Sequence, residues 1–452
     1  TQAVATTTDA IVTQKFTTST PWVAPLGVTK VEALVVAGGG AGGRGTGGGG
    51  GGGGAGGVIY NNQYPVIPGQ PYTVAVGTGA LGITTSIPGS SGANSIFGLN
   101  LLTNGNGTTD GWTAYNATLS SVNGSLRVAD NGLYSKAYLA INTVIGQTYI
   151  LTVNVTAITG NNAIVSIGPI GPERENWQTN NSSSNTTGFI EVSHVATATT
   201  TYIELGSEST FYVDYNNISV TLASNSIVAI GGGGGGGNGN AAYHVGLNGG
   251  SGGGAGDSSA ADVGGTGTVG QGFNGGASAV GAPDYGAGGG GGGGGTGGNG
   301  TVYSTGNGGV GLPFGITGNI EYYAGGGGGG AGYNNTAGNG SIGTGGLGGG
   351  GGGGYNGSVA LVNATANTGG GGGGVNNIGN TGLASGNGGS GVAILRYRVP
   401  AVAEFKDSGT WTCPAGIYSV QALIVAGGGG GGPPGGAGGG AGGLIYASSV
   451  AV

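Results

Sequence analysis

The side chains that enzymes use for catalysis are sparse in this chain and form no recognisable set. His194 and His244 lie in different kinds of sequence, and no Ser, Cys or Asp has a recognisable partner to activate it as a nucleophile. Glu173 and Glu175 flank Arg174 in a loop-like stretch, where surface ion pairing explains them better than general acid–base catalysis. The sequence predicts no enzymatic activity, and a polysaccharide-active enzyme is the weakest of the functions considered.

Aromatic side chains indicate a different chemistry, the binding of sugars. Aromatic rings stack on sugar rings, and amide groups bond sugar hydroxyls. Trp177 lies between the charged ERE and the polar stretch TNNSSSNTTG, so we expect its ring to be exposed. Tyr115 and Tyr134 lie in the same region. We therefore expect Trp177, Tyr115 and Tyr134 to bind a ligand, and a cell-surface glycan fits them best.

Composition excludes several partners. The 452 residues include 123 Gly, 16 acidic residues and only nine Lys and Arg, too few for the basic footprint that nucleic acids require. No run of about 20 apolar residues occurs, so we expect no membrane insertion. Cys413 is the single cysteine, and we expect a small buried residue there rather than a reactive thiol. The start has neither Met nor a signal-peptide pattern, so we expect a processed chain or a segment of a longer one.

An internal repeat organises the chain. Residues 16–38, FTTSTPWVAPLGVTKVEALVVAG, match residues 405–427, FKDSGTWTCPAGIYSVQALIVAG, and AGGVIY recurs as AGGLIY after the glycine run that follows. Such repetition indicates successive similar units. The repeat and the composition predict three regions, which are a discontinuous glycine-rich domain at 1–98 plus 224–399, an inserted domain at 100–222, and the start of a second glycine-rich repeat at 400–452.

The glycine runs admit two explanations. Flexible linkers would contribute reach without structure. Packed polyglycine would form extended helices with three residues per turn, bonded sideways to their neighbours so that each buried N–H and C=O finds a partner. The runs recur at similar lengths between short inserts that contain turn-forming residues, which favours packed helices. The main runs are 47–54, 231–237, 288–295, 325–330, 348–354, 369–374 and 427–432.

The region 100–222 has no long glycine runs and reads as strands. Segments such as TYILTVNVTAI and TFYVDYNNISVTL mostly alternate apolar and polar residues, as half-buried antiparallel strands do. About seven short strands with polar turns predict an antiparallel β-sandwich. The fold class we expect is therefore all-β, with a polyglycine-II helix bundle framed by β-strands and an inserted β-sandwich.

The glycine-rich part resembles a known family. Phe16, Trp22, Pro25 and Gly27, the junction VEALVVAGGGAGG, IPGQPYTVAVG, SIFG and the closing GVAILRYR together resemble the glycine-rich domain of phage tail-fibre and bacterial surface proteins. The resemblance implies a polyglycine bundle framed by strands, with a surface that contacts host-cell receptors.

The insert resembles a carbohydrate-binding-module jelly roll. NLLTNGNGTTDGWTAYNATLS, AYLAINTVIGQTYILTVNV and FYVDYNNISV are similar to its opening, middle and final strand. This resemblance implies a structural calcium ion, with Asn106 and Asp214 as ligands by position. Apart from that ion we expect no cofactor.

These observations lead to a structural and adhesive surface fibre protein, most naturally of the viral tail-fibre or receptor-binding type, on a virion surface or outside the cell. The repeat at 405–452 lacks the strands that would complete it, so we expect either that the chain continues in the intact protein or that a neighbouring subunit supplies them. The second possibility leads to the alternative function, a secreted microbial filament subunit that polymerises by strand exchange between neighbours. Both hypotheses predict that the chain associates with itself as a homo-oligomer or filament.

Overall fold

The computed structural model describes residues 10–102, 108–132, 134–160, 162–171, 177–178, 180–207, 212–257, 262–279, 286–332, 342–355, 363–377, 382–399, 410–411, 413, 419–430 and 439–452. The chain divides into two compact units, one of Ile11–Val399 and one of Thr1–Ala10 with Pro400–Val452, and each is described by itself. Within the described residues the regular elements are β-strands and two short 3-10 helices, which confirms the all-β class. Neither of these short helices has the length and apolar character needed to cross a bilayer.

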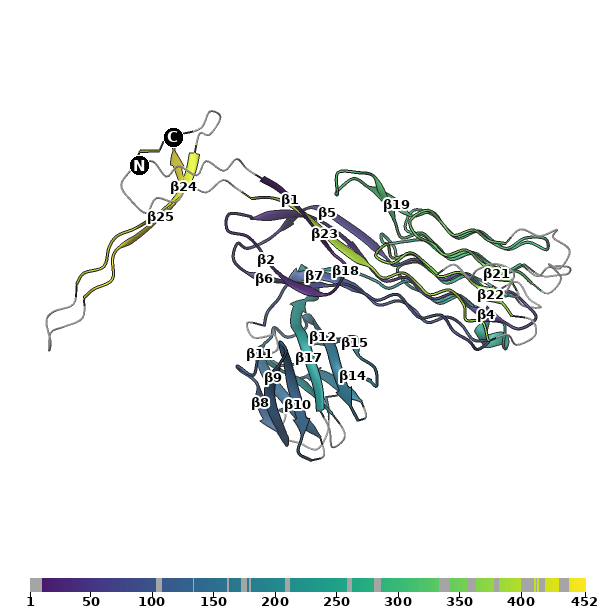
Figure 1. Ribbon diagram of the computed structural model, residues 1–452, viewed down its shortest axis with the longest axis horizontal. Helices are drawn as coiled ribbons and strands as arrows, with labels where there is room; N and C mark the ends of the chain where they lie inside the picture. Colours follow the sequence, from purple (N-terminus) through teal and green to yellow (C-terminus); the bar gives the residue numbers. More distant parts are fainter. Residues whose placement is uncertain are drawn as a thin grey trace. The chain divides into compact units, whose positions relative to one another are not determined.

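Two four-stranded sheets form the framework of the larger unit (Figure 1). The strand orders are β1-β23-β3-β5 and β18-β7-β6-β2. The strands are β1 Ala10–Phe16, β2 Thr20–Val23, β3 Lys30–Val36, β5 Val58–Pro65, β6 Pro71–Ala75, β7 Ser95–Leu99, β18 Ile227–Ala229 and β23 Val392–Val399.

The framework core lies between these sheets and is aromatic. Trp22 lies within 6.0 Å, centroid to centroid, of the rings of Tyr72, Phe97 and Tyr397. Aromatic pairs at this spacing add about 0.5–1.5 kcal/mol each beyond the burial of their area. Phe16 and Trp22, two residues of the repeated motif, are therefore core residues that join one sheet to the other.

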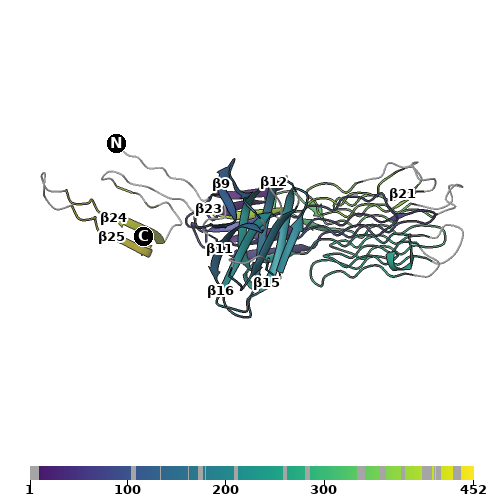
Figure 2. The ribbon, with the colours of Figure 1, turned by 90° about the horizontal axis from the view of Figure 1, so that it is seen from below.

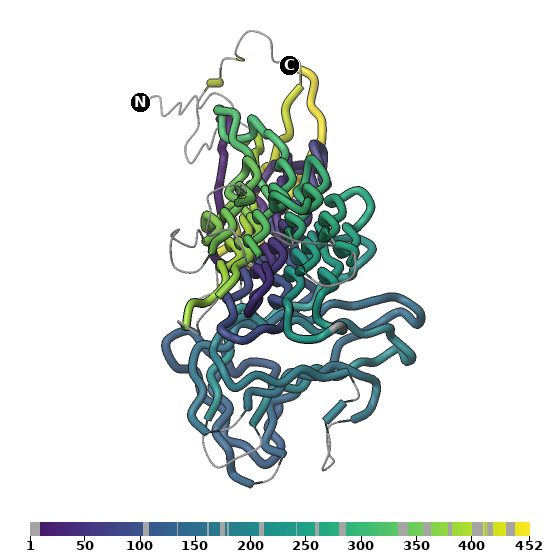
Figure 3. Tube along the Cα trace, turned by 90° about the vertical axis from the view of Figure 1, so that its right-hand side faces the viewer, coloured from purple at the N-terminus to yellow at the C-terminus, as the bar shows by residue number. Residues whose placement is uncertain are grey.

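The glycine runs extend from the ends of the framework strands and lie side by side (Figure 2). In the run Gly51–Gly57, successive N–H groups donate to three different neighbouring runs in turn, at 2.7–3.0 Å. The acceptors of residues 51, 54 and 57 lie in 230–236, those of 52 and 55 in 288–291, and those of 53 and 56 in 369–372. This three-residue repeat is the pattern that a helix with three residues per turn requires. Figure 3 looks along the runs, whose traces form compact coils packed against one another.

Short elements complete this part of the unit. β4, β21 and β22 form a small parallel sheet, β19 pairs with β20, and the two 3-10 helices are single turns. Their bounds are β4 Arg44–Gly45, β19 Leu312–Phe314, β20 Glu321–Tyr323, β21 Gly354–Tyr355, β22 Val375–Asn376, η1 Ala223–Asn225 and η2 Ala241–Tyr243.

Two five-stranded sheets form the β-sandwich, with orders β15-β12-β17-β10-β9 and β14-β13-β16-β11-β8. Residues that alternate along these strands meet in a separate apolar core that includes Leu126, Val165 and Leu205. The strands are β8 Thr113–Tyr115, β9 Ala117–Val122, β10 Ser125–Asp130, β11 Ser135–Asn142, β12 Thr148–Thr159, β13 Ala163–Gly168, β14 Asn180–Ser184, β15 Gly188–Val195, β16 Thr200–Ser207 and β17 Tyr212–Leu222. The predicted antiparallel sandwich is confirmed, while the exact domain bounds stay a prediction.

The described residues of the second unit include an antiparallel hairpin, β24 (Ser419–Val425) with β25 (Leu444–Ala451). Its apolar side chains are exposed, for example Leu423 at 62% and Leu444 at 65%. An isolated two-stranded hairpin is marginally stable in water. The described part of this unit therefore lacks the burial that stabilises the framework strands.

Candidate functional site

The outer face of the sheet β14-β13-β16-β11-β8 gathers the most unusual side chains of the sandwich. Along β11 the residues alternate, so that Ala137 points into the core while Lys136 and Tyr138 point outward. Antiparallel partners share a face, which places Glu204 of β16 beside Tyr138. Tyr202, two residues before Glu204, lies on the same face. The sheet register thus brings together charged and aromatic groups from separate strands.

A buried ion pair lies on this face. Lys136 Nζ and Glu204 Oε1 are 3.4 Å apart, and both side chains are 0% exposed. Ser166 Oγ donates to Glu204 Oε2 at 2.8 Å, and the Gln178 N–H donates to the same oxygen at 3.3 Å. A buried pair is favourable only when further hydrogen bonds satisfy its atoms, and these neighbours do so.

Two aromatic rings flank the ammonium group of Lys136. Its Nζ lies 4.9 Å from the Trp177 ring centroid and 5.6 Å from that of Tyr115, both within cation–π range. The Trp177 ring also occupies the space above Gly206 where a larger residue would place its side chain. Glycine at 206 therefore leaves room for the Trp177 ring against this part of the sheet.

The three predicted ligand-binding residues have different surroundings. Trp177 is half-buried rather than freely exposed, because its ring covers Lys136 and Gly206. Its indole Nε1 has no hydrogen-bond partner among the residues that the structure describes. Tyr115 shares the Lys136 cluster, whereas Tyr134 is half-buried before β11 with a φ of 59°. The structure therefore brings Trp177 and Tyr115 together, and no described contact joins Tyr134 to them.

Sequence reasoning missed the charged members of this face. Tyr138 and Tyr202 are partly exposed, and Lys136 and Glu204 are buried beside them. The alternation in KAYLAIN and TTYIELG carried a signal, because it separates these residues from the apolar positions. The pairing of β11 with β16 was required to show that the two strands present them together.

The calcium prediction involves Asp214. Both Asp214 carboxylate oxygens accept hydrogen bonds from Arg127, each at 2.7 Å, and the Arg127 guanidinium stacks 3.5 Å from the Tyr212 ring centroid. Asn106 lies outside the described residues. The calcium site stays a prediction, and the partner that the structure gives Asp214 is a cationic side chain.

The residues considered for catalysis are dispersed. His194 is buried in β15, which lowers its pKa, and His244 Nδ1 lies 3.3 Å from Asp262 in the glycine-rich part. Glu173 and Glu175 lie outside the described residues. Within the described part of the chain, no three His, Cys, Asp or Glu residues form a group that could hold a metal ion.

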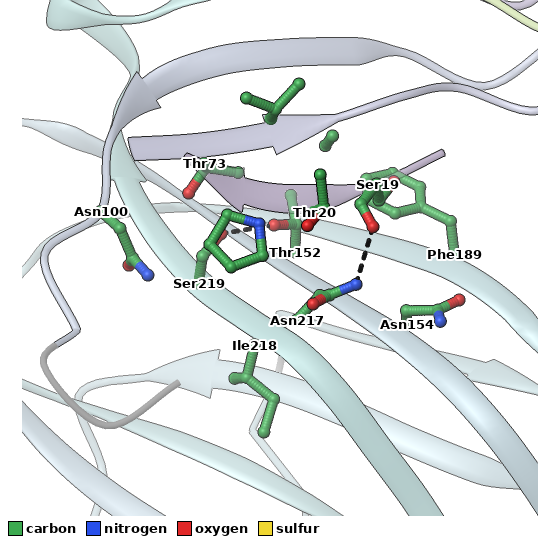
Figure 4. A pocket seen from close by; sticks show the side chains of 13 residues that line it. Ser19, Thr20, Thr73, Asn100, Thr152, Asn154, Phe189, Asn217, Ile218 and Ser219 are labelled. Carbon is green, nitrogen blue, oxygen red and sulfur yellow. Dashed lines mark hydrogen bonds between the residues drawn. The ribbon is translucent and has the colours of Figure 1, made fainter. Parts of the chain in front are cut away.

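A small pocket lies where the sandwich meets the framework (Figure 4). Asn217 Nδ2 donates to the Ser19 carbonyl at 2.9 Å across this boundary. Thr152 and Ser219, 2.7 Å apart between their hydroxyl oxygens, bond each other on the sandwich side. The Asn217 bond therefore joins the sandwich to the framework, while the hydroxyl of Thr73 in the pocket wall has no hydrogen-bond partner among the described residues.

A second contact strengthens the same joint. Asn94 Nδ2 donates to Glu191 Oε1 at 3.1 Å, while Asn94 Oδ1 accepts from the Gly231 N–H at 2.8 Å. Burial raises the pKa of Glu191, and the bond from Asn94 opposes that shift. Ile96 of β7 and Ile150 of β12 pack together beside these residues. The sandwich is thus held on the framework by apolar contacts as well as hydrogen bonds.

Comparison with known proteins gives a family and several distant structural likenesses. No curated protein matches the chain. One similar solved structure is described as "CBM4 structure and function", with 14% identity, a TM-score of 0.21, and coverage of 25% of this chain and 86% of that one. Another is the enzymatically active domain of tailspike protein 4 of bacteriophage CBA120, with 15% identity, a TM-score of 0.20, and coverage of 27% and 21%. Similarity at this level carries no conclusion about this chain.

The family match is far more extensive. The family model described as a glycine-rich domain matches residues 13–132 and 144–398, which is most of the chain. The matched residues include the framework strands and the laterally bonded glycine runs of the larger unit. The chain belongs to the glycine-rich domain family.

Proposed function

We propose that this protein is a non-enzymatic structural and adhesive fibre protein of the viral tail-fibre or receptor-binding type, located on a virion surface or outside the cell. Its glycine runs are polyglycine-II helices that make a stiff support. Its sandwich binds a cell-surface glycan through the outer face of the sheet β14-β13-β16-β11-β8.

The stiffness follows from the hydrogen bonds between runs. Each turn of the run Gly51–Gly57 is bonded to three neighbouring runs, so bending one run must displace the others. A flexible linker has no such bonds and behaves as a random coil, so it offers little resistance to bending. Because the sandwich is also bonded to the framework through Asn217 and Asn94, the support holds the sandwich in a defined orientation.

The cluster of aromatic residues on the sandwich face is the observation that carries the glycan proposal. Tyr115, Tyr138, Tyr202 and Trp177 all retain exposed surface there. Rings with exposed faces can stack on the apolar side of a sugar, while nearby hydroxyl and amide groups bond its oxygens. The buried pair of Lys136 and Glu204 lies beneath these rings and holds their support in place.

A glycan array followed by calorimetry tests this proposal. The full chain is screened first, and the affinity of the best glycan is then measured for the wild type, Tyr138→Ala and Tyr202→Ala. Loss of one stacking ring is expected to weaken binding about tenfold, equivalent to 1.4 kcal/mol. Tyr303→Ala is the matched control, because Tyr303 is 63% exposed and lies in the glycine-rich part.

Two results would contradict the proposal. If no glycan on the array binds the chain, the adhesive role is refuted. If Tyr303→Ala and Tyr138→Ala lose equal glycan affinity, the binding site does not lie on this face.

Light scattering on the same preparation measures the predicted homo-oligomer. Incubation of the chain with the bound glycan checks that no hydrolysis occurs.

A further inference from the structure

An Asn–Gly dipeptide makes the same two-point contact at three places on the glycine-rich part of the larger unit. In the first, Asn248 Oδ1 accepts a hydrogen bond from the Thr266 N–H at 2.7 Å, and the Gly249 N–H donates to the Thr266 carbonyl at 3.2 Å. A side-chain amide oxygen can accept from a backbone N–H just as a peptide carbonyl does. We call this contact, in which Asn and the following Gly bond both backbone groups of one residue, an Asn–Gly clamp.

The other two clamps have the same geometry. Asn299 Oδ1 accepts from the Ala277 N–H at 2.9 Å, and the following glycine donates to the Ala277 carbonyl at 2.9 Å. Asn307 Oδ1 accepts from the Thr344 N–H at 2.9 Å, and the following glycine donates to the Thr344 carbonyl at 2.8 Å. Each clamp therefore joins two runs that are neighbours in the bundle.

A related contact occurs at two more Asn–Gly dipeptides. Asn274 Oδ1 accepts from the Gly267 N–H at 2.9 Å, and Asn387 Oδ1 accepts from the Gly82 N–H at 2.6 Å. In both cases the following glycine donates to the carbonyl two residues before that N–H. The recurrence indicates a role for the dipeptide that does not depend on the surrounding sequence.

The clamps lie on the outward side of their runs. The N–H groups on either side of Asn299 bond two different runs, at Asn307 and Ala277, whereas the N–H of Asn299 itself bonds no residue that the structure describes. The same is true of Asn248 and Asn307, and all three asparagines are exposed. Because a helix with three residues per turn presents every third residue on one side, these asparagines occupy the side where a further run would be bonded.

Interior positions of the bundle show why glycine is needed for runs to pack. A Cβ atom at Gly290 would overlap the Gly53 carbonyl oxygen on the neighbouring run. An asparagine at an outward position places a Cβ atom and an amide group in the space where such a run would have to lie. Its Oδ1 also accepts from the exposed N–H of the neighbouring run, which then has no need of a further acceptor.

Outer runs without these asparagines would be open to other chains. Unpaired backbone N–H and C=O groups at an edge are a template for pairing with another chain. Each copy of this protein contains 123 Gly, so a second copy offers many runs with the same backbone groups. A bundle of bare glycine runs could therefore add runs from a second copy at its surface.

We propose that the Asn–Gly clamps end the polyglycine bundle within one chain, by preventing its outer runs from bonding a glycine run of a second copy. The amide oxygen satisfies the exposed N–H of the neighbouring run, and the Cβ atom of the asparagine prevents the close approach that packed runs require. The predicted homo-oligomer is left to form through other surfaces of the protein.

Analytical ultracentrifugation of the full chain tests this proposal. The clamp variant combines Asn248→Gly, Asn299→Gly and Asn307→Gly, which removes three clamps and leaves glycine at each outward position. The control combines substitutions of exposed asparagines for which the structure gives no side-chain hydrogen bond to a described residue, Asn62→Gly, Asn142→Gly and Asn319→Gly. We expect the clamp variant to associate beyond the wild-type oligomer at a concentration about tenfold lower than the control, equivalent to about 1.4 kcal/mol.

Amide hydrogen exchange separates a new contact between copies from simple loosening of the bundle. At low concentration the N–H groups of Thr266, Ala277 and Thr344 should exchange faster in the clamp variant than in the wild type, because their acceptor is gone. As the concentration rises, the N–H groups of the three substituted residues should become protected, because a run of a second copy then bonds them.

Three results would overturn the proposal. The first is a clamp variant that associates no more than the control. The second is association without protection of the substituted residues, since the copies would then meet elsewhere. The third is unchanged exchange of Thr266, Ala277 and Thr344 at low concentration, which would show that the asparagine side chains do not bond these groups in solution.

Discussion

Replacing Gly53 by alanine should unfold or strongly destabilise the glycine-rich part. A methyl group on Gly53 would lie 2.8 Å from the Ala41 carbonyl carbon and closer still to the Gly40 oxygen. Carbon atoms in contact are normally about 3.5–4.0 Å apart, so the neighbouring run must move by roughly 1 Å. The bonds that this movement stretches include Gly40 to Gly54 at 2.9 Å and Gly372 to Gly40 at 2.9 Å.

The magnitude follows from those bonds. A buried backbone group left without its partner costs about 1–3 kcal/mol, so loss of two bonds costs about 2–6 kcal/mol. That is a large fraction of the 5–15 kcal/mol by which domains are ordinarily stable. Ala55 lies in the same run and is fully buried, which shows that a methyl group is accepted only where the neighbouring chain leaves room.

Urea denaturation followed by circular dichroism measures the effect. Gly315→Ala is the control, because no atom lies within 4 Å of the methyl group it would add. We expect the control to change the free energy of unfolding by less than about 0.5 kcal/mol. Equal stability of Gly53→Ala and Gly315→Ala would show that the glycine runs are loose, and the whole account of the support would fail.

Three further predictions concern buried charges. Lys136→Met and Glu204→Gln should each lower the free energy of unfolding, measured in urea, by about 3–5 kcal/mol, because each variant leaves one buried charge without its partner. The double variant should lose less than the sum of the two single losses, and additive losses would contradict the pairing. Burial raises the pKa of Asp257 to about 8, above the 3.8 of the unfolded chain. The stability that the protonated Asp257 carboxyl contributes to the folded state is therefore fully present below about pH 4 and is lost as the pH rises through 8. Asp257→Asn should flatten that decline in the unfolding midpoint, and an unchanged slope would refute the assignment. If the predicted calcium ion joins Asn106 to Asp214, chelation by EDTA should lower the unfolding temperature of the wild type but not that of Asp214→Ala. Identical responses of the two proteins to EDTA would refute the calcium site.

The internal repeat shows how far sequence reasoning reached. The match of 16–38 with 405–427 predicted two related units, and the structure gives their strand pairs the same register. Sequence similarity specifies local pairing because alternate apolar residues and the turn between two strands set which residues lie opposite each other. The strands of the sandwich were predictable for the same reason.

The candidate site shows where that reasoning ended. Trp177 was predicted as an exposed ring from the polar residues around it, but it packs over Lys136 and Gly206. Lys136 and Glu204 are 68 residues apart, so their pairing depends on β11 and β16 lying side by side. Long-range pairing of this kind is a property of the whole sheet rather than of either segment.

The sequence by itself determined the all-β class, the repeat and the glycine runs, because composition and alternation act locally. Only the tertiary structure decided which run bonds which, and which side chains share the sandwich face. The Gly53 N–H, for example, donates to the Gly372 carbonyl, in a pattern that repeats along the run. Any other glycine run would offer the same carbonyl groups as acceptors. The choice among identical partners is made by the framework strands, which hold the ends of each run in fixed positions.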